Sequence, residues 1–174
     1  MKKAVFLDRD GVLSKTILKN GKSFAPKKLK DFKLFSYSTR SVKKLKSAGF
    51  MVFVVSNQPD VGKKLISKNI LNKMHTKLKK KTNVDKIYFC SHRQDQNCYC
   101  RKPNPGMIFD AAKKYNIDLK NSFMVGDRAS DIEAGHRAKC RTIFLNKNYQ
   151  EKAPIKQEAT FKNLISATNY ILNQ

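Results

Sequence analysis

The sequence has no apolar run approaching the ~20 residues that a membrane-spanning helix needs, and it has no internal repeat or low-complexity linker. Met1-Lys2-Lys3 and the apolar residues after it imitate the start of a signal peptide, but Asp8 ends that stretch after four residues. We therefore expect a protein of the cytoplasm that has no contact with a membrane. Its 174 residues are enough for one domain, 1–174, and we expect a monomer.

Acidic residues are scarce: 13 stand against 37 basic ones, which gives a net charge of +24. Clusters such as Lys27-Lys28 and Lys79-Lys80-Lys81 could contact the phosphates of a nucleic acid. The cations are mostly lysine, however, and no aromatic residues are interleaved with them to stack on bases. A solvated surface that attracts anions is the favoured interpretation, and a basic nucleic-acid-binding protein stays open as the alternative.

Short apolar runs alternate along the chain with segments of helical periodicity. Leu65 to Leu78 places its apolar residues on one stripe, as an amphipathic helix does, and Phe161 to Ile171 suits a closing helix. His75 and His136 fall within helical patterns and are predicted to be surface residues. The predicted strands are Ala4–Leu7, Met51–Val55, Ile87–Phe89, Phe123–Val125 and Thr142–Leu145.

This alternation predicts an α/β fold. We expect a doubly wound, Rossmann-like parallel sheet of about five strands, with helices on both faces and the ligand crevice at the carboxyl ends of the strands. Fewer than fifty residues separate Asp8 from Ser56, and Ser56 from Lys102, so no separate cap domain fits between them. The polar, lysine-rich loop from Ser14 to Phe35 could form a rim over a substrate.

Asp8 and Asp10 follow the first predicted strand directly. Two carboxylates this close repel each other unless a cation lies between them, and oxygen ligands suit Mg²⁺. Gly11 then allows a sharp turn of the backbone. One aspartate could attack phosphorus while the other carries a proton. The competing interpretation is a turn with two solvated aspartates.

Four further residues form a possible metal site: Cys90, His92, Cys98 and Cys100. Three thiols and one imidazole suit a closed, tetrahedral Zn²⁺ site, which would pin the loop between them. A disulfide, or reduced thiols with no common role, are the alternatives; no sign of secretion favours the disulfide. Cys140 stands apart and is expected to be a small buried hydrophobic residue.

Polar residues also mark other strand ends and loops: Ser56 and Asn57, Arg101-Lys102, and Asp127 with Arg128 and Asp131. The order nucleophile, hydroxyl, cation and second acid resembles the four motifs of the haloacid dehalogenase superfamily, from Phe6 to about Leu145. Asp10 places this resemblance among the superfamily's phosphatases, because its dehalogenases lack the second aspartate. The cysteines add a closer resemblance to the zinc-containing, capless branch that acts on heptose bisphosphates and histidinol phosphate.

The resemblance implies a role for each matching residue. Asp8 would be the nucleophile and Asp10 the general acid/base. Mg²⁺ would be bound by Asp8, Asp127 and the carbonyl of Asp10, with Asp131 supporting these ligands. The phosphoryl group would be stabilised by Ser56 and Lys102, and the substrate bound by Asn57, Arg101 and Arg128.

The implied reaction is Mg²⁺-dependent hydrolysis of a phosphomonoester of a small metabolite, through an aspartyl-phosphate. A heptose bisphosphate is the expected substrate, because Lys102 to Ile108 resembles the heptose enzymes. Histidinol phosphate is the alternative, because Gly126 to Asp131 and the short zinc loop are nearer to its phosphatases. The charge keeps a nucleic-acid 3′-phosphatase open as well. After Gln58 the sequence departs from the family's glycine turn ending in Arg-Gly, and reads Pro59 to Lys63.

Overall fold

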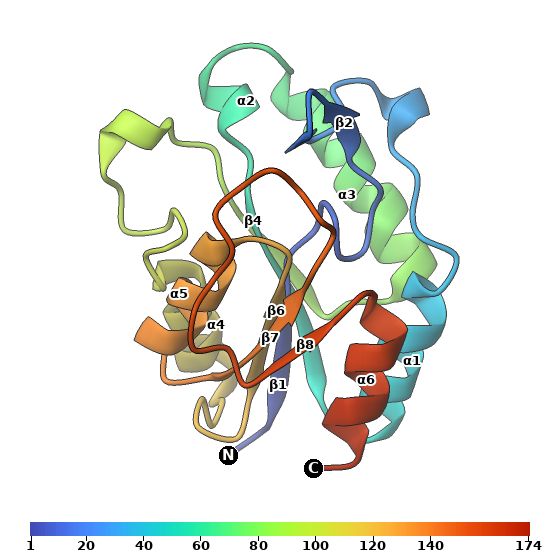
Figure 1. The fold of residues 1–174 in the computed structure, drawn as a ribbon, viewed down its shortest axis with the longest axis vertical. Helices are drawn as coiled ribbons and strands as arrows, with labels where there is room; N and C mark the ends of the chain where they lie inside the picture. The colour runs from blue at the N-terminus through green and yellow to red at the C-terminus, as the bar shows by residue number, and fades with distance from the viewer.

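The computed structural model describes residues 1–174 and contains a six-stranded parallel sheet in the order β5-β4-β1-β6-β7-β8 (Figure 1). The strands are β1 (Ala4–Leu7), β4 (Met51–Asn57), β5 (Lys86–Cys90), β6 (Phe123–Gly126), β7 (Arg141–Leu145) and β8 (Ala159–Phe161). The doubly wound α/β prediction is confirmed, but the predicted count of about five strands is one short. The additional strand, β8, is only three residues long, and it includes Phe161, which the closing helix does not.

Helices cover both faces of the sheet. α1 (Ser38–Ser47), α3 (Lys68–Thr82) and α6 (Leu164–Leu172) lie on the right in Figure 1, and α4 (Gly106–Tyr115) and α5 (Ala129–Arg137) lie on the left. Alternate strand residues point to opposite faces, so the sheet has an apolar core on each side. Val5 and Leu7 belong to the core under α1, α3 and α6, whereas Ala4 and Phe6 belong to the core under α4 and α5. None of the helices has the length and apolar character to cross a bilayer.

Short elements surround the carboxyl ends of the strands, at the top of Figure 1. They are the hairpin β2 (Ile17–Lys19) and β3 (Lys22–Phe24), the 3₁₀ helices η1 (Leu29–Asp31) and η2 (Gln94–Gln96), and α2 (Pro59–Gly62). The hairpin turns at Asn20 and Gly21, which both have positive φ and are the residue types that adopt it most easily. These elements are too small to form a separate cap domain, as predicted.

A helix was predicted correctly in the region of α3, but its predicted bounds, Leu65 to Leu78, are wrong. The helix runs from Lys68 to Thr82, because the Ser67 side chain accepts a hydrogen bond from the amide of Ile70 at one end and Asn83 closes the other end in a left-handed conformation. His75 is not a surface residue: it is 8% exposed, and its ring faces Arg9.

The prediction that His136 on α5 is a surface residue is also wrong. His136 is half-buried, and its Nε2 lies 3.0 Å from Oγ1 of Thr142. Both imidazoles have polar partners inside the fold, which helical periodicity alone does not reveal.

Candidate active site

Strand β1 brings Asp8 and Asp10 to the middle of the sheet's carboxyl edge, because it lies between β4 and β6. The Asp8 amide continues the ladder and donates to the carbonyl of Val125 over 3.0 Å. Gly11 then turns the chain with a φ of 93°, and its amide donates to the carbonyl of Ser14. Both aspartates line the cavity at this edge.

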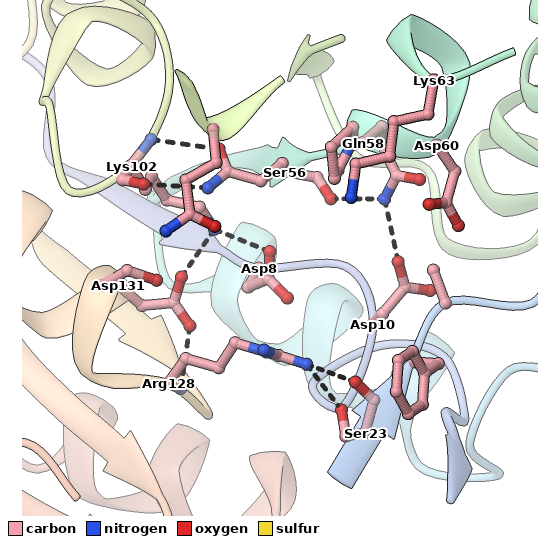
Figure 2. Close-up of a pocket in the computed structure, with 16 residues that line it drawn as sticks. Asp8, Asp10, Ser23, Ser56, Gln58, Asp60, Lys63, Lys102, Arg128 and Asp131 are labelled. Carbon is pink, nitrogen blue, oxygen red and sulfur yellow. Dashed lines mark hydrogen bonds and ion pairs between the residues drawn. The ribbon is translucent and has the colours of Figure 1, made fainter. Parts of the chain in front are cut away.

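The cavity has a volume of about 380 Å³ and is lined mainly by polar side chains (Figure 2). This volume suits a small metabolite. Ser23, Phe24 and Ala25 of the hairpin segment form part of its wall, which agrees with the rim expected for Ser14 to Phe35. The other lining residues are Asp8, Asp10, Ser56, Asn57, Gln58, Pro59, Asp60, Lys63, Gln94, Lys102, Arg128, Ser130 and Asp131.

Lys102 joins two acidic residues at the base of this cavity. Its Nζ lies 2.7 Å from Oδ1 of Asp8 and 2.7 Å from Oδ1 of Asp131, and it also donates to the carbonyl of Val55. Burial alone would lower the pKa of Lys102, but Asp131 and Asp8 outweigh that effect and raise it. A charged ammonium beside the nucleophile is well placed to offset the charge of a phosphoryl group.

Asp127 is buried beside Asp8 and Asp131. Both of its carboxylate oxygens are buried and lack a hydrogen-bond partner. Burial, and then the charges of Asp8 and Asp131, raise its pKa well above the ordinary value. Burial also raises the pKa of Asp8 to about 6, although Lys102 opposes the shift.

Asp8, Asp127 and Asp131 each bring one oxygen within 4.8 Å of the others. Buried carboxylates at such distances repel each other, and a cation between them removes the repulsion. The all-oxygen donor set and the orphaned oxygens of Asp127 therefore fit Mg²⁺. The Asp10 carboxylate is not part of this group.

Ser56 and Asn57 occupy the end of β4. The Ser56 hydroxyl lines the cavity and accepts from Nε2 of Gln58 over 2.9 Å. Asn57 exchanges two hydrogen bonds with the backbone of Lys102, at 2.9 and 3.0 Å. Asn57 therefore also fastens the Lys102 segment to the sheet, a role that the sequence does not predict.

The two predicted substrate-binding arginines differ in position. Arg128 lines the cavity, where it donates to the Ser23 carbonyl and hydroxyl and pairs with Glu151 at 2.9 Å. Arg101 is not among the lining residues, and its Nη1 donates to the carbonyl of His92. The hydrogen bond to the cysteine-containing loop draws Arg101 away from the cavity.

Gln58, Asp60, Lys63 and Gln94 line the cavity but are not among the predicted site residues. Each is a single polar residue in, or directly beside, one of the short helices α2 and η2, and only the folded chain brings them together. One sequence signal points to this part of the cavity wall: between Pro59 and Lys63 the sequence departs from the family's glycine turn, and three of these residues line the cavity.

The predicted zinc ligands do come together. Adjacent pairs among Cys90, His92, Cys98 and Cys100 are separated by 3.4 to 3.7 Å between their sulfur and Nδ1 atoms. A tetrahedral zinc site with Zn–S bonds of about 2.3 Å has ligand–ligand edges of about 3.8 Å, so the four atoms fit Zn²⁺. None of the cysteines forms a disulfide, and Cys140 is buried elsewhere, as expected.

Comparison with known proteins now adds to this geometry. Residues 99–167 match the family model described as HAD-hydrolase-like. The chain is also 34% identical to the D-glycero-alpha-D-manno-heptose-1,7-bisphosphate 7-phosphatase of Photorhabdus laumondii, over 97% of this chain and 96% of that protein. The chain belongs to the haloacid dehalogenase-like hydrolases. It is a phosphatase of that superfamily.

Other relatives of this phosphatase carry related names. The D-glycero-beta-D-manno-heptose-1,7-bisphosphate 7-phosphatase of Helicobacter pylori is 34% identical, over 82% of this chain and 83% of that protein. A solved D,D-heptose 1,7-bisphosphate phosphatase from B. bronchiseptica, complexed with magnesium and phosphate, superposes with a TM-score of 0.82. It is 28% identical, and 98% of each chain is covered.

Proposed function

We propose that this phosphatase removes the 7-phosphate of a D-glycero-D-manno-heptose 1,7-bisphosphate. The observation that carries the proposal is the 34% identity to the P. laumondii enzyme along almost the whole chain. The cavity supports it, because Lys102 lies beside Asp8 while Lys63, labelled at the upper right of Figure 2, lines another part of the wall. Cations on two sides suit a substrate with two phosphates. Relatives named for both anomers support the heptose bisphosphates as the substrate class.

In the proposed reaction a carboxylate oxygen of Asp8 attacks phosphorus, and the bond from phosphorus to the sugar oxygen breaks. As the general acid, Asp10 gives a proton to the departing sugar oxygen. It then takes a proton from water, whose oxygen attacks the aspartyl-phosphate and releases inorganic phosphate and Asp8. Lys102, between Asp8 and Asp131, offsets charge on the phosphoryl group, and the Ser56 hydroxyl is available to bind one of its oxygens.

The metals of the proposal have separate sites. Mg²⁺ would be held by Asp8, Asp127 and the Asp10 carbonyl, and when bound it neutralises phosphoryl charge. Asp131 would support this site by holding Lys102 and the amides of Asp127 and Arg128. Zn²⁺, bound by Cys90, His92, Cys98 and Cys100, would fix the loop that leads into Lys102. We further infer a monomeric, single-domain enzyme of the cytoplasm, where thiolates stay reduced.

The test is turnover by the purified protein with Mg²⁺, on heptose bisphosphates of both anomers, histidinol phosphate and 3′-phosphorylated oligonucleotides. We expect a heptose bisphosphate to have the highest kcat/KM and to lose only one phosphate. Asp8→Asn should lower turnover by several orders of magnitude without unfolding the protein. Asp95→Asn, in the exposed η2 segment, is the matched control and should keep wild-type turnover. Faster turnover of histidinol phosphate or of an oligonucleotide would contradict the proposed substrate.

A further inference from the structure

Arg9 lies between the two catalytic aspartates, and its side chain is completely buried. Arginine is seldom found fully buried, because a guanidinium removed from water must be paired and hydrogen-bonded. Its side chain reaches His75 on α3. A charge buried at this position, in the residue directly after the nucleophile, needs a functional explanation.

The guanidinium of Arg9 is directed at the carboxylate of Asp10. Nε and Nη2 both donate to Oδ2 of Asp10, over 2.9 and 2.6 Å. Nη2 also donates to Oε1 of Gln58 over 2.9 Å, and Nε2 of Gln58 donates to the same Oδ2 of Asp10 over 2.9 Å. The Ser14 hydroxyl donates a hydrogen bond to the other oxygen of Asp10, Oδ1, over 3.0 Å. Three side chains therefore fix both oxygens of Asp10.

The Arg9 guanidinium also has contacts on the side away from Asp10. Its Nη1 lies 3.1 Å from Nε2 of His75, and the Phe32 ring lies 5.3 Å from the centre of its guanidinium. Burial, together with the charge of Arg9, lowers the pKa of His75 to about 4, so the imidazole is neutral and its Nε2 accepts the hydrogen bond. The planar guanidinium is thus locked between α3 and the Asp10 carboxylate.

We propose that Arg9 is a positioning residue for Asp10: with Gln58 and Ser14 it fixes the Asp10 carboxylate at the cavity wall. This inference rests on the proposed phosphatase mechanism, in which Asp10 acts twice, on the sugar oxygen and then on water. Both steps need the carboxylate at hydrogen-bond distance from an oxygen on the same side of the phosphorus. Arg9 itself touches neither substrate nor phosphorus, since it does not line the cavity.

Arg9→Lys tests the proposal, because lysine keeps the positive charge and loses the planar fork. A misplaced Asp10 slows hydrolysis of the aspartyl-phosphate but not its formation from 4-nitrophenyl phosphate, whose leaving group needs no proton. We expect a burst of about one nitrophenolate per chain, followed by steady turnover reduced at least 10²-fold, the low end of what acid–base catalysis contributes. Turnover of the heptose bisphosphate should fall by at least as much. Asp10→Asn should give the same pattern more strongly.

Arg137→Lys, in an exposed pair with Glu133 on α5, is the matched control and should behave as wild type. Wild-type kinetics in Arg9→Lys would overturn the proposal, and so would an equal loss of burst rate and steady rate, which indicates general structural damage. If Arg9→Lys does not fold, Gln58→Met decides in the same assay, because it removes the contacts of Gln58 to both Arg9 and Asp10. An inactive wild-type protein would instead refute the proposed function.

Discussion

A side chain on Gly11 would place its Cβ 1.7 Å from Oδ2 of Asp127. Gly11 has a φ of 93°, so glycine serves both the turn after Asp10 and the space for the buried Asp127 carboxylate. A methyl group at Gly11 would therefore collide with this carboxylate and displace it. The position of the proposed Mg²⁺ ligand therefore depends on the absence of a methyl group on the opposite loop.

Gly11→Ala should abolish Mg²⁺-dependent turnover by displacing Asp127. Gly49→Ala is a matched control, because Gly49 has a similar φ of 86° but no atom within 4 Å of the added Cβ. Both variants should lose roughly 1–2 kcal/mol of stability from backbone strain. Only Gly11→Ala should lose Mg²⁺ binding, measured by titration calorimetry, and turnover. Equal Mg²⁺ affinity in the two variants would show that Asp127 is not a ligand.

The four clustered cysteine and histidine side chains lead to a second prediction. Zinc should co-purify at about one ion per chain from reducing buffer and should survive brief dialysis. Cys98→Ser should lose the zinc, lower the melting temperature and reduce turnover, because the loop leads directly into Lys102. Cys140→Ala is the control: its thiol lies outside the cluster, so zinc content should stay at the wild-type value. Metal analysis of fresh wild-type protein without zinc would rule the site out.

The sequence allows the prediction of those parts of the site that local patterns encode. Asp8 and Ser56 each follow an apolar run, and a buried strand ending in a polar residue is recognisable without the rest of the fold. The zinc ligands are likewise close in the chain. The hairpin was also within reach, since Asn20-Gly21 is a strong turn signal, and Ser67 and Asn83 mark the ends of α3.

Contacts between distant residues are not encoded in this way. The burial of His75 depends on Arg9, 66 residues earlier, and on the packing of α3 against the turn after β1. Arg101 is drawn away from the cavity by a carbonyl of the cysteine loop, although its neighbour Lys102 is buried at the cavity base. Adjacent residues with the same charge thus receive different roles from tertiary structure.

The buried imidazole predicts a pH-dependent stability. His75 has an unfolded pKa near 6.5 and a folded pKa of about 4, so the unfolded chain binds the proton first as pH falls. His75 should therefore reduce the stability of the fold progressively from pH 6.5 down to pH 4, by about 2 kcal/mol at pH 5. At pH 7.5 this contribution is absent.

Urea unfolding at pH 7.5 and pH 5 measures this effect. His75→Gln keeps an acceptor for Arg9 but does not titrate, so its loss of stability between the two pH values should be smaller than that of wild type by about 2 kcal/mol. His136→Gln should retain the wild-type loss, because it leaves His75 in place. The same pH dependence in wild type and His75→Gln would show that the buried imidazole does not control acid stability.

The positive charge is concentrated in one part of the chain. Residues 15–86 carry 20 of the 37 basic residues and only three of the 13 acidic ones, and they include the hairpin, α1 and α3. Lys79, Lys80 and Lys81 at the end of α3 are all exposed. If this region only attracts small anions, oligonucleotides should bind weakly and without sequence preference.

Titration of labelled duplex and single-stranded oligonucleotides at several salt concentrations tests this. We expect binding at low salt that disappears near physiological ionic strength, where exposed charges are screened beyond ~8 Å. Substituting Lys79, Lys80 and Lys81 with Glu should remove the low-salt binding, whereas Lys113→Glu with Lys114→Glu on α4, on the other face of the sheet, should largely preserve it. Sugar phosphate turnover should be unchanged in both. Tight binding at physiological salt, with a log–log slope of about −0.9 per phosphate contacted, would instead identify a nucleic-acid partner.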